Sequence, residues 1–202
     1  MITTLLIDLW QTLATKKMRI FERIQQEYAL SDDAFPFFKD LMLRMEVAEI
    51  DEDGFWLSLY SEYAIDPAKP RLKWIDIYHE ITVINQDLMH FADEFKLNGG
   101  SVVLFSNTDP AAKQYLDAKN VTQLFTKTFF SFDARLLKPR PELIEYVLNE
   151  LSVSPGEILY IDDNPDCIET AKRYGINGIV YVDFPDFINK VERYHLMSRQ
   201  VL

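Results

Sequence analysis

The ten residues SVVLFSNTDP, at positions 101–110, show the pattern that decides the fold of this 202-residue chain. An apolar run that follows two glycines and ends in polar residues is typical of a buried strand. Asp109 and Pro110 then supply an N-cap and a first helical residue, so a helix is predicted from here to about Leu116. A strand followed directly by a helix is the repeating unit of α/β proteins.

The rest of the second half repeats this order. Further strands are predicted at KTFFSFD (127–133), EILYIDD (157–163) and GIVYVD (178–183). Helices are predicted at RPELIEYVLNEL (140–151), from Asn164-Pro165 as far as Gly175, and at FPDFINKVERYHLM (184–197). Strands that alternate with helices of this length run parallel, because each helix carries the chain back along the sheet. The predicted fold class is therefore α/β, with a doubly wound parallel sheet.

The first half of the chain shows a different pattern. TTLLIDLWQTL (3–13) begins as a buried strand, but amphipathic helices follow, and no further strand is predicted until about residue 101. Apolar and aromatic residues recur there at helical spacing, which is typical of helix-packing faces. These stripes are Met18, Phe21, Ile24 and Tyr28; Phe55, Trp56, Leu59, Tyr60 and Tyr63; and Trp74, Ile75, Tyr78 and Ile81. We therefore expect residues 14–84 to form a helical cap, inserted into an α/β core of residues 1–13 and 85–202.

Composition narrows the class of protein. Hydrophobic residues make up 48% of the chain and charged residues 26%, as in proteins that bury a full core. A net charge of −11 argues against a nucleic-acid partner, because phosphate backbones are bound by clustered Lys and Arg. The N-terminal residues lack the basic and apolar segments of an export signal, so no membrane association is expected. Because Cys167 is the only cysteine, the expected location is a reducing compartment, the cytoplasm.

Polar side chains follow the predicted strands at the edge where open parallel sheets bind their ligands, outside the carboxyl ends. Those residues are Asp8 after LLI, Ser106 and Asn107 after VVLF, Asp162 and Asp163 after ILYI, and Lys138 before the helix that begins near Pro141. Each alone has an ordinary structural explanation, as a helix cap, a turn residue or a solvated charge. Their coincidence at one edge of the sheet indicates a functional site.

The charges at this edge predict a metal and a phosphate. Two carboxylates about 4 Å apart repel by about 4 kcal/mol at an effective dielectric constant of about 20, so Asp8, Asp162 and Asp163 call for a cation or a shared proton. Carboxylate oxygens beside a hydroxyl and an ammonium suit Mg²⁺ that bridges to a phosphate. Lys138 would offset the remaining negative charge, and the Ser106 hydroxyl would hold a phosphoryl oxygen. Asp8 would be the nucleophile.

Taken in order, these residues resemble the four motifs of the haloacid dehalogenase (HAD) superfamily. The matching segments are Asp8-x-x-x-Thr12, Ser106-Asn107, Lys138 within KPRP, and IDDNPDCIETAKRYGI at positions 161–176. The helical insert resembles that superfamily's C1-type cap. The remainder is similar to the subgroup that contains sugar-phosphate phosphatases and the N-terminal phosphatase domain of soluble epoxide hydrolase.

The resemblance implies a role for each matching residue in a Mg²⁺-dependent hydrolase of a small phosphorylated metabolite. Asp8 and Lys138 would be catalytic, with an aspartyl-phosphate formed on Asp8. The substrate would be bound by Thr12, Ser106 and Asn107. The metal would be held by Asp8, the backbone carbonyl of Trp10, Asp162 and Asp163. Neither the motifs nor the composition specify the substrate or an oligomeric state.

Trp10 departs from the superfamily's pattern. Most phosphatases of the superfamily resemble Asp-x-Asp-x-Thr, in which the second Asp is the general acid/base, and an indole N–H can only donate. Positioned acid–base help is typically worth about 10²–10⁴-fold, so its loss slows an enzyme without abolishing its activity. We therefore rank a Mg²⁺-dependent phosphohydrolase first and a slow or inactive phosphate-binding relative second.

A 2-haloacid dehalogenase is the third alternative. The motif of those enzymes resembles Asp-x-Tyr-Gly-Thr, with an aromatic residue at the position of Trp10, and a departing halide needs no proton. Against this alternative stand Asp162 and Asp163, which would repel the carboxylate of a haloacid.

Overall fold

A computed structural model describes residues 1–196 of the chain. Its main sheet contains five parallel strands in the order β5-β4-β1-β6-β7. The strands are β1 (Thr4–Ile7), β4 (Ser101–Ser106), β5 (Lys127–Phe130), β6 (Ile158–Asp162) and β7 (Asn177–Val180). The predicted doubly wound parallel sheet is confirmed, because the chain adds β4 and β5 on one side of the central strand β1 and then β6 and β7 on its other side.

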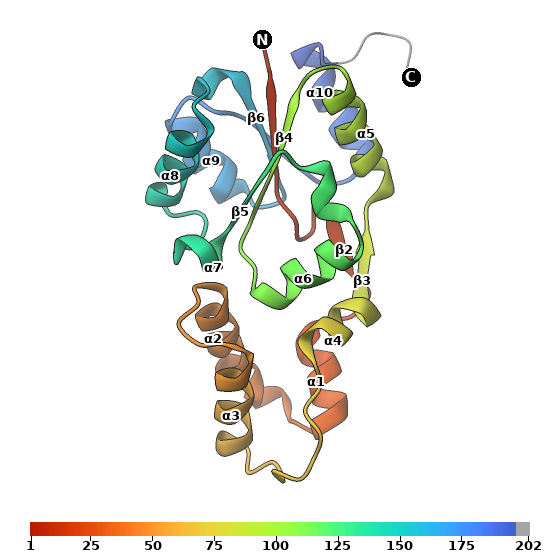
Figure 1. Cartoon of the computed structure of the whole chain (residues 1–202), viewed down its shortest axis with the longest axis vertical. Helices are drawn as coiled ribbons and strands as arrows, with labels where there is room; N and C mark the ends of the chain where they lie inside the picture. Colours follow the sequence, from red (N-terminus) through yellow and green to blue (C-terminus); the bar gives the residue numbers. More distant parts are fainter. Residues whose placement is uncertain (197–202) are drawn as a thin grey trace.

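Helices cover both faces of the sheet (Figure 1). The helices of the second half of the chain are α5 (Gln86–Leu97), α6 (Pro110–Ala118), α7 (Ser131–Ala134), α8 (Pro141–Leu151), α9 (Pro165–Arg173) and α10 (Phe184–Val191). Helices α8 and α9 lie on one side and α5 and α10 on the other. The two faces belong to separate apolar clusters, since Leu6 packs with the α8 and α9 side while its neighbours Leu5 and Ile7 pack with the opposite side.

The register of the sheet brings the predicted site residues together. Ile7, the last residue of β1, pairs with Leu104 of β4 and with Ile161 of β6. The next residue on each strand therefore emerges at the same edge, so Asp8 leaves β1 between Phe105 and Asp162.

A second group of helices forms the lower half of Figure 1. It contains α1 (Ile20–Tyr28), α2 (Phe35–Glu46), α3 (Glu52–Glu62) and α4 (Trp74–Ile81). Aromatic rings fill its interior, with Phe55 edge-to-face on both Trp56 and Trp74 at centroid distances of 5.2 Å and 5.0 Å. The aromatic stripes thus serve as packing faces, although on α4 it is Ile77 that is buried while Ile75 is only half-buried. Helix α4 also packs against α6 of the core.

The prediction that no strand lies between Leu13 and about residue 101 is wrong. β2 (Ala14–Lys16) and β3 (Thr82–Ile84) form a two-stranded antiparallel ribbon in which Ala14 pairs with Ile84. Strands of three residues are too short to show an alternating pattern, and their pairing depends on residues far apart in the sequence. This ribbon carries the chain out of the sheet to α1 and back from α4.

Other predicted elements differ mainly in where they end. The strand predicted over 127–133 stops at Phe130, where the short helix α7 begins. The last helix, predicted over 184–197, ends at Val191 and is followed by a 3₁₀ turn, while position 197 lies outside the described residues. Short 3₁₀ segments also occur at Asp32–Ala34, Val121–Leu124, Pro155–Glu157 and Glu192–Tyr194. Among the helices of residues 1–196, none combines the length and the apolar character that a membrane span needs.

Candidate active site

Lys138 joins the carboxylates of two strand ends. Its Nζ lies 2.5 Å from Oδ1 of Asp8 and 2.7 Å from Oδ2 of Asp162, and it also donates to the backbone carbonyl of Phe105 at 3.0 Å. The side chains are 6%, 6% and 1% exposed for Lys138, Asp8 and Asp162, so water screens these ion pairs very little. Residues 130 positions apart in the sequence therefore share one buried ion pair.

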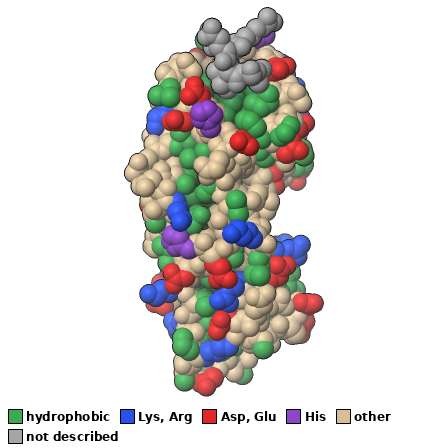
Figure 2. Space-filling model, turned by 90° about the vertical axis from the view of Figure 1, so that its right-hand side faces the viewer, with side chains coloured by type: hydrophobic (Ala, Val, Ile, Leu, Met, Phe, Trp, Pro, Cys, Tyr) green, Lys and Arg blue, Asp and Glu red, His purple; other side chains and the backbone are tan. Residues whose placement is uncertain are grey.

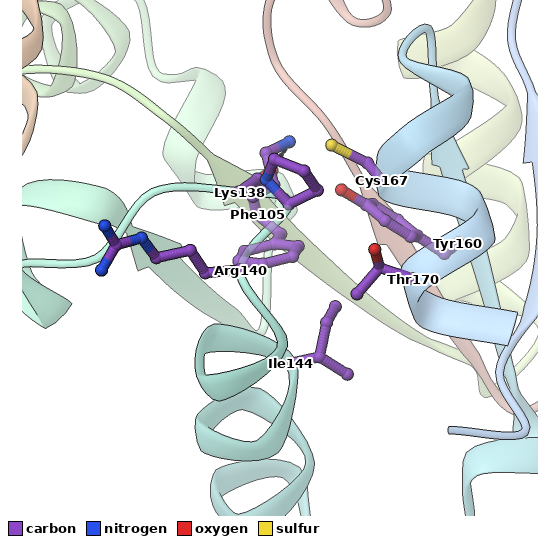
Figure 3. A pocket seen from close by; sticks show the side chains of 8 residues that line it. Phe105, Lys138, Arg140, Ile144, Tyr160, Cys167 and Thr170 are labelled. Carbon is purple, nitrogen blue, oxygen red and sulfur yellow. Dashed lines mark hydrogen bonds between the residues drawn. The ribbon is translucent and has the colours of Figure 1, made fainter. Parts of the chain in front are cut away.

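Asn107 holds Lys138 in this position. Its Oδ1 accepts from the backbone N–H of Lys138 at 2.8 Å, and its Nδ2 donates to the carbonyl of the same residue at 3.1 Å. The rings of Phe105 and Tyr160 lie 5.0 Å and 5.7 Å from the ammonium and flank its stem. Figure 3 shows these rings around Lys138, while the exposed Arg140 extends away from them.

The three acids at this edge fit a divalent cation. One oxygen from each of Asp8, Asp162 and Asp163 lies within 4.8 Å of the other two. Asp162 is fixed from several sides, since Oδ1 accepts from the N–H of Asn164 at 2.8 Å and Oδ2 accepts from Lys138 and the Tyr160 hydroxyl. Converging carboxylates outnumber the single ammonium among them, and hard oxygen donors of this kind suit Mg²⁺.

Burial controls the ionisation of this cluster. It raises the pKa of Asp8 to about 7, and the charge of Asp162 adds to that effect, whereas Lys138 acts in the opposite direction. Burial alone would lower the pKa of Lys138, but the attraction of Asp8 and Asp162 outweighs it and raises that pKa above its ordinary value. The ammonium therefore stays charged, and Asp8 ionises near neutral pH.

Thr12, Ser106 and Asp163 occupy different environments near this edge. Thr12 and Ser106 are fully buried, and the Ser106 hydroxyl donates to the carbonyl of Asn107 at 3.2 Å. The Thr12 hydroxyl has no hydrogen-bond partner among residues 1–196. Asp163 is half-buried and thus the most accessible acid of the cluster. Contacts of Thr12, Ser106 and Asn107 with a substrate stay a prediction. The side chain of Asn107 is already hydrogen-bonded to the backbone of Lys138.

Trp10 lies between helix α4 and the loop that follows β4. Its indole N–H donates to Oγ1 of Thr108 at 3.2 Å, and its ring stacks on Tyr78 of α4 with centroids 5.5 Å apart and planes 16° apart. The ammonium of Lys16 lies 3.5 Å from the ring centroid. The ring therefore packs on the helical segment, and its only donor is already bonded.

Tyr78 also makes a buried bond from the helical segment to the core. Its hydroxyl donates to Oδ2 of Asp109, and both side chains are 1% exposed. The other oxygen of Asp109 caps α6 as predicted, accepting from the N–H groups of Ala111 and Ala112 at 2.9 Å and 3.0 Å. Sequence reasoning missed this pair, because a cap residue gives no sign of a second partner from another helix.

The region where the helical segment meets the core around Trp10, Tyr78 and Asp109 is called the junction. Glu46, the last residue of α2, faces this junction. Burial, helped by the charge of Asp109, raises its pKa to about 7 against the opposing attraction of Lys16 and Lys138. Because the folded protein binds this proton more tightly than the unfolded chain, Glu46 lowers the free energy of unfolding as the pH rises from about 4.5 to about 7.

We therefore expect Glu46→Gln to stabilise the protein at pH 8 by about 1–3 kcal/mol more than at pH 5, because the amide removes a carboxylate that must ionise where water is scarce. Urea unfolding at both pH values measures the difference. Glu49→Gln is the matched control, since Glu49 is 59% exposed and paired with Arg44. An equal pH dependence in the wild type and in Glu46→Gln would contradict the prediction.

A cavity of about 470 Å³ lies where the helical segment meets the core. Its walls come from the α2–α3 connection and from the start of α6: Met45, Ala48, Glu49, Ile50, Asp51, Gly54 and Pro110. Pro110 directly follows Asp109, so the cavity begins beside the junction that Trp10 and Tyr78 occupy. In the side view of Figure 2 the surface is indented between the upper core and the lower helical part.

The chain belongs to the haloacid dehalogenase-like hydrolase family, whose sequence profile matches residues 5–181. The match includes both the strand ends of the site and the helical segment, so the family expected from the motifs is confirmed.

Solved structures share this fold, and a curated relative is similar over part of the sequence. An HAD-like family hydrolase of Porphyromonas gingivalis superposes with a TM-score of 0.77 at 20% identity, covering 98% of this chain and 100% of its own. An HAD family enzyme of Bacteroides thetaiotaomicron, in complex with magnesium and inorganic phosphate, also gives 0.77 at 20% identity, covering 93% and 99%. Bifunctional epoxide hydrolase 2 of Rattus norvegicus is 24% identical over 115 residues, which are 54% of this chain and 21% of that protein.

Proposed function

We propose that this chain is a Mg²⁺-dependent phosphohydrolase that cleaves a small phosphorylated metabolite through an aspartyl-phosphate on Asp8. The observation that carries the proposal is the position of Lys138 between Asp8 and Asp162, with Asp163 close enough to share a cation with both. The enzyme of Bacteroides thetaiotaomicron with magnesium and inorganic phosphate supports the same ligands for this site.

In the first step an Asp8 oxygen attacks the phosphorus, and the bond from phosphorus to the leaving-group oxygen breaks with its electron pair. The leaving group then takes a proton from water. In the second step water attacks the same phosphorus, which frees the Asp8 carboxylate and releases inorganic phosphate and a proton. Lys138 favours the ionised form of Asp8 and offsets the charge of the phosphoryl group.

Asp8, Asp162, Asp163 and the carbonyl of Trp10 would hold the magnesium ion. When bound, it would supply positive charge opposite the phosphoryl oxygens. Asp162 is suited to the role because Asn164, Lys138 and Tyr160 fix both of its oxygens. Such support orients a metal ligand before the ion arrives.

Trp10 sets the kind of leaving group that the site can expel. In the motif of related phosphatases an acid stands at this position, whereas here the indole donates to Thr108 and packs on Tyr78. An alkoxide that departs without a proton donor is strongly disfavoured, but a nitrophenolate is stable enough to depart alone. The side-chain contacts of Trp10 therefore favour slow turnover of alkyl phosphates.

The proposal predicts Mg²⁺-dependent release of p-nitrophenol from p-nitrophenyl phosphate, with a kcat/KM at least about 100-fold above that for ethyl phosphate. Colorimetric assays of nitrophenol and phosphate measure both, with EDTA as the metal-free control. Equal rates for the two substrates would contradict the role of Trp10, and no Mg²⁺-dependent turnover would contradict hydrolysis. A lasting adduct of one phosphate on Asp8, seen by mass spectrometry, would instead favour the slow phosphate-binding relative.

We also propose that residues 14–84 act as a cap over the core of residues 1–13 and 85–202. Support comes from the separate aromatic interior of α1–α4 and from their attachment through the β2–β3 ribbon.

We further propose that the protein is located in a reducing compartment such as the cytoplasm. The buried thiol of Cys167, the only cysteine in the sequence, supports this location.

A further inference from the structure

Lys16 carries a positive charge into the junction beside Trp10. It is the last residue of β2, its side chain is half-buried, and its Nζ lies 3.5 Å from the centroid of the Trp10 ring. The ring face attracts the ammonium, but a π system does not replace the acceptors that its N–H groups lose on leaving water. Burial lowers the pKa of Lys16 to about 8, because loss of water disfavours the charged form.

The carboxyl groups that face Lys16 do not bind it. Asp109, Glu46 and Asp8 attract its charge. Yet among residues 1–196 none of these three places a carboxylate oxygen within 4.0 Å of the Lys16 Nζ, so none forms a salt bridge with it. Asp109 is already bonded to Tyr78 and to the start of α6, and Asp8 is paired with Lys138. Lys16 therefore lies near Asp8, and none of the residues 1–196 accepts a hydrogen bond from its ammonium.

From this arrangement we infer that Lys16 binds a second anionic group on the substrate, a carboxylate or a second phosphate, while the first phosphate lies at Asp8. The inference rests on the proposed function and names the class of its substrate: small phosphomonoesters with a second negative charge.

The geometry gives Lys16 a role that the other nearby cations do not have. Lys138 is already paired with Asp8 and Asp162, and Arg140 is exposed and extends away from the site (Figure 3). An ammonium in partial burial binds an anion more strongly than an exposed lysine does, because less water competes for it.

The test uses stable phosphonates, so that it reports binding without turnover. Titration calorimetry with Mg²⁺-loaded protein compares phenylphosphonate with its 3-carboxy, 3-phosphono and 3-aminomethyl derivatives. The variants are Lys16→Met, which keeps an apolar contact with Trp10, and Lys16→Arg, which keeps the charge. Lys17→Met is the matched control, since the neighbouring Lys17 side chain is exposed.

We expect a carboxylate or a second phosphate to tighten binding to the wild type by about 10–100-fold over phenylphosphonate. The gain should fall to about twofold or less in Lys16→Met, should persist in Lys16→Arg, and should be unchanged in Lys17→Met. Whichever anionic derivative gains more identifies the second group. Phenylphosphonate itself should bind equally to all four proteins.

Several results would overturn the inference. These are an equal affinity for neutral and anionic derivatives, a gain that survives in Lys16→Met, a tighter binding of the aminomethyl derivative, and no binding of any phosphonate. The aminomethyl result would mean that Glu46, Asp109 and Asp8 make the junction prefer a cation. If the anionic phosphonates bind through Lys16 but no phosphomonoester is hydrolysed, the proposed hydrolysis fails while the binding role of Lys16 stands.

Discussion

Asp8→Asn will lower the kcat for p-nitrophenyl phosphate by at least about 10⁴-fold, because the amide cannot form the phosphorylated intermediate. The asparagine keeps the size of the side chain, and Lys138 keeps its contact with Asp162, so the fold should persist. Steady-state assays with Mg²⁺ measure the rate, and thermal unfolding verifies that the variant is folded. Asp8→Ala provides a second variant that cannot revert to aspartate by deamidation.

The control for this experiment is Asp87→Asn, which makes the same chemical change at an exposed position in the first turn of α5. Its rate should match the wild type within about twofold, since surface substitutions away from a site have small effects. If Asp8→Asn and Asp8→Ala both keep more than a tenth of the wild-type rate, Asp8 is not the nucleophile.

Lys138→Met will lower the free energy of unfolding of the metal-free protein by about 3–5 kcal/mol, because it leaves two buried carboxylates without their counter-ion. The loss should be smaller at pH 5 than at pH 8. Burial and Asp162 already raise the pKa of Asp8 to about 7 with Lys138 present, and without the ammonium Asp8 will hold its proton to still higher pH. Mg²⁺ should restore part of the loss, since it supplies the missing charge.

Urea denaturation at both pH values, with and without Mg²⁺, measures these differences in the free energy of unfolding. Lys127→Met is the matched control, because Lys127 pairs with Glu150 at 2.6 Å but the two side chains are 40% and 45% exposed. Breaking that pair should cost at most about 1 kcal/mol. Equal losses in the two variants would show that Lys138 does not neutralise the cluster, and a Mg²⁺ effect of the same size on both would exclude the metal site.

The positions of Asp8 and Asp162 follow from the sequence because they depend on a general property of parallel sheets. Each apolar run ends at one edge, so the polar residue that follows it must emerge there. The helical packing faces were predictable for a similar reason, since apolar side chains at helical spacing lie on one face of the helix, and that face is the one it buries. These features depend on local periodicity and on the order of the strands.

Features that join distant residues could not be predicted in this way. The Tyr160 hydroxyl reaches Asp162 because side chains two positions apart lie on the same side of a strand, yet nothing in ILYID separates that contact from ordinary packing. The bond from Tyr78 to Asp109 and the approach of Lys16 to Trp10 depend on how α4 and the β2–β3 ribbon lie against the core. Their side chains would have the same sequence context if that arrangement were different.

The pairing of Ala14 with Ile84 also bears on how such a protein can diversify. The segment between these residues leaves the core and returns to it at paired positions of the β2–β3 ribbon, so its two ends stay close together whatever its length. Closing a longer loop adds little entropic cost, about 0.6 kcal/mol for each doubling of its length. Descendants of this gene could therefore exchange the whole segment while the residues at the strand ends were inherited unchanged.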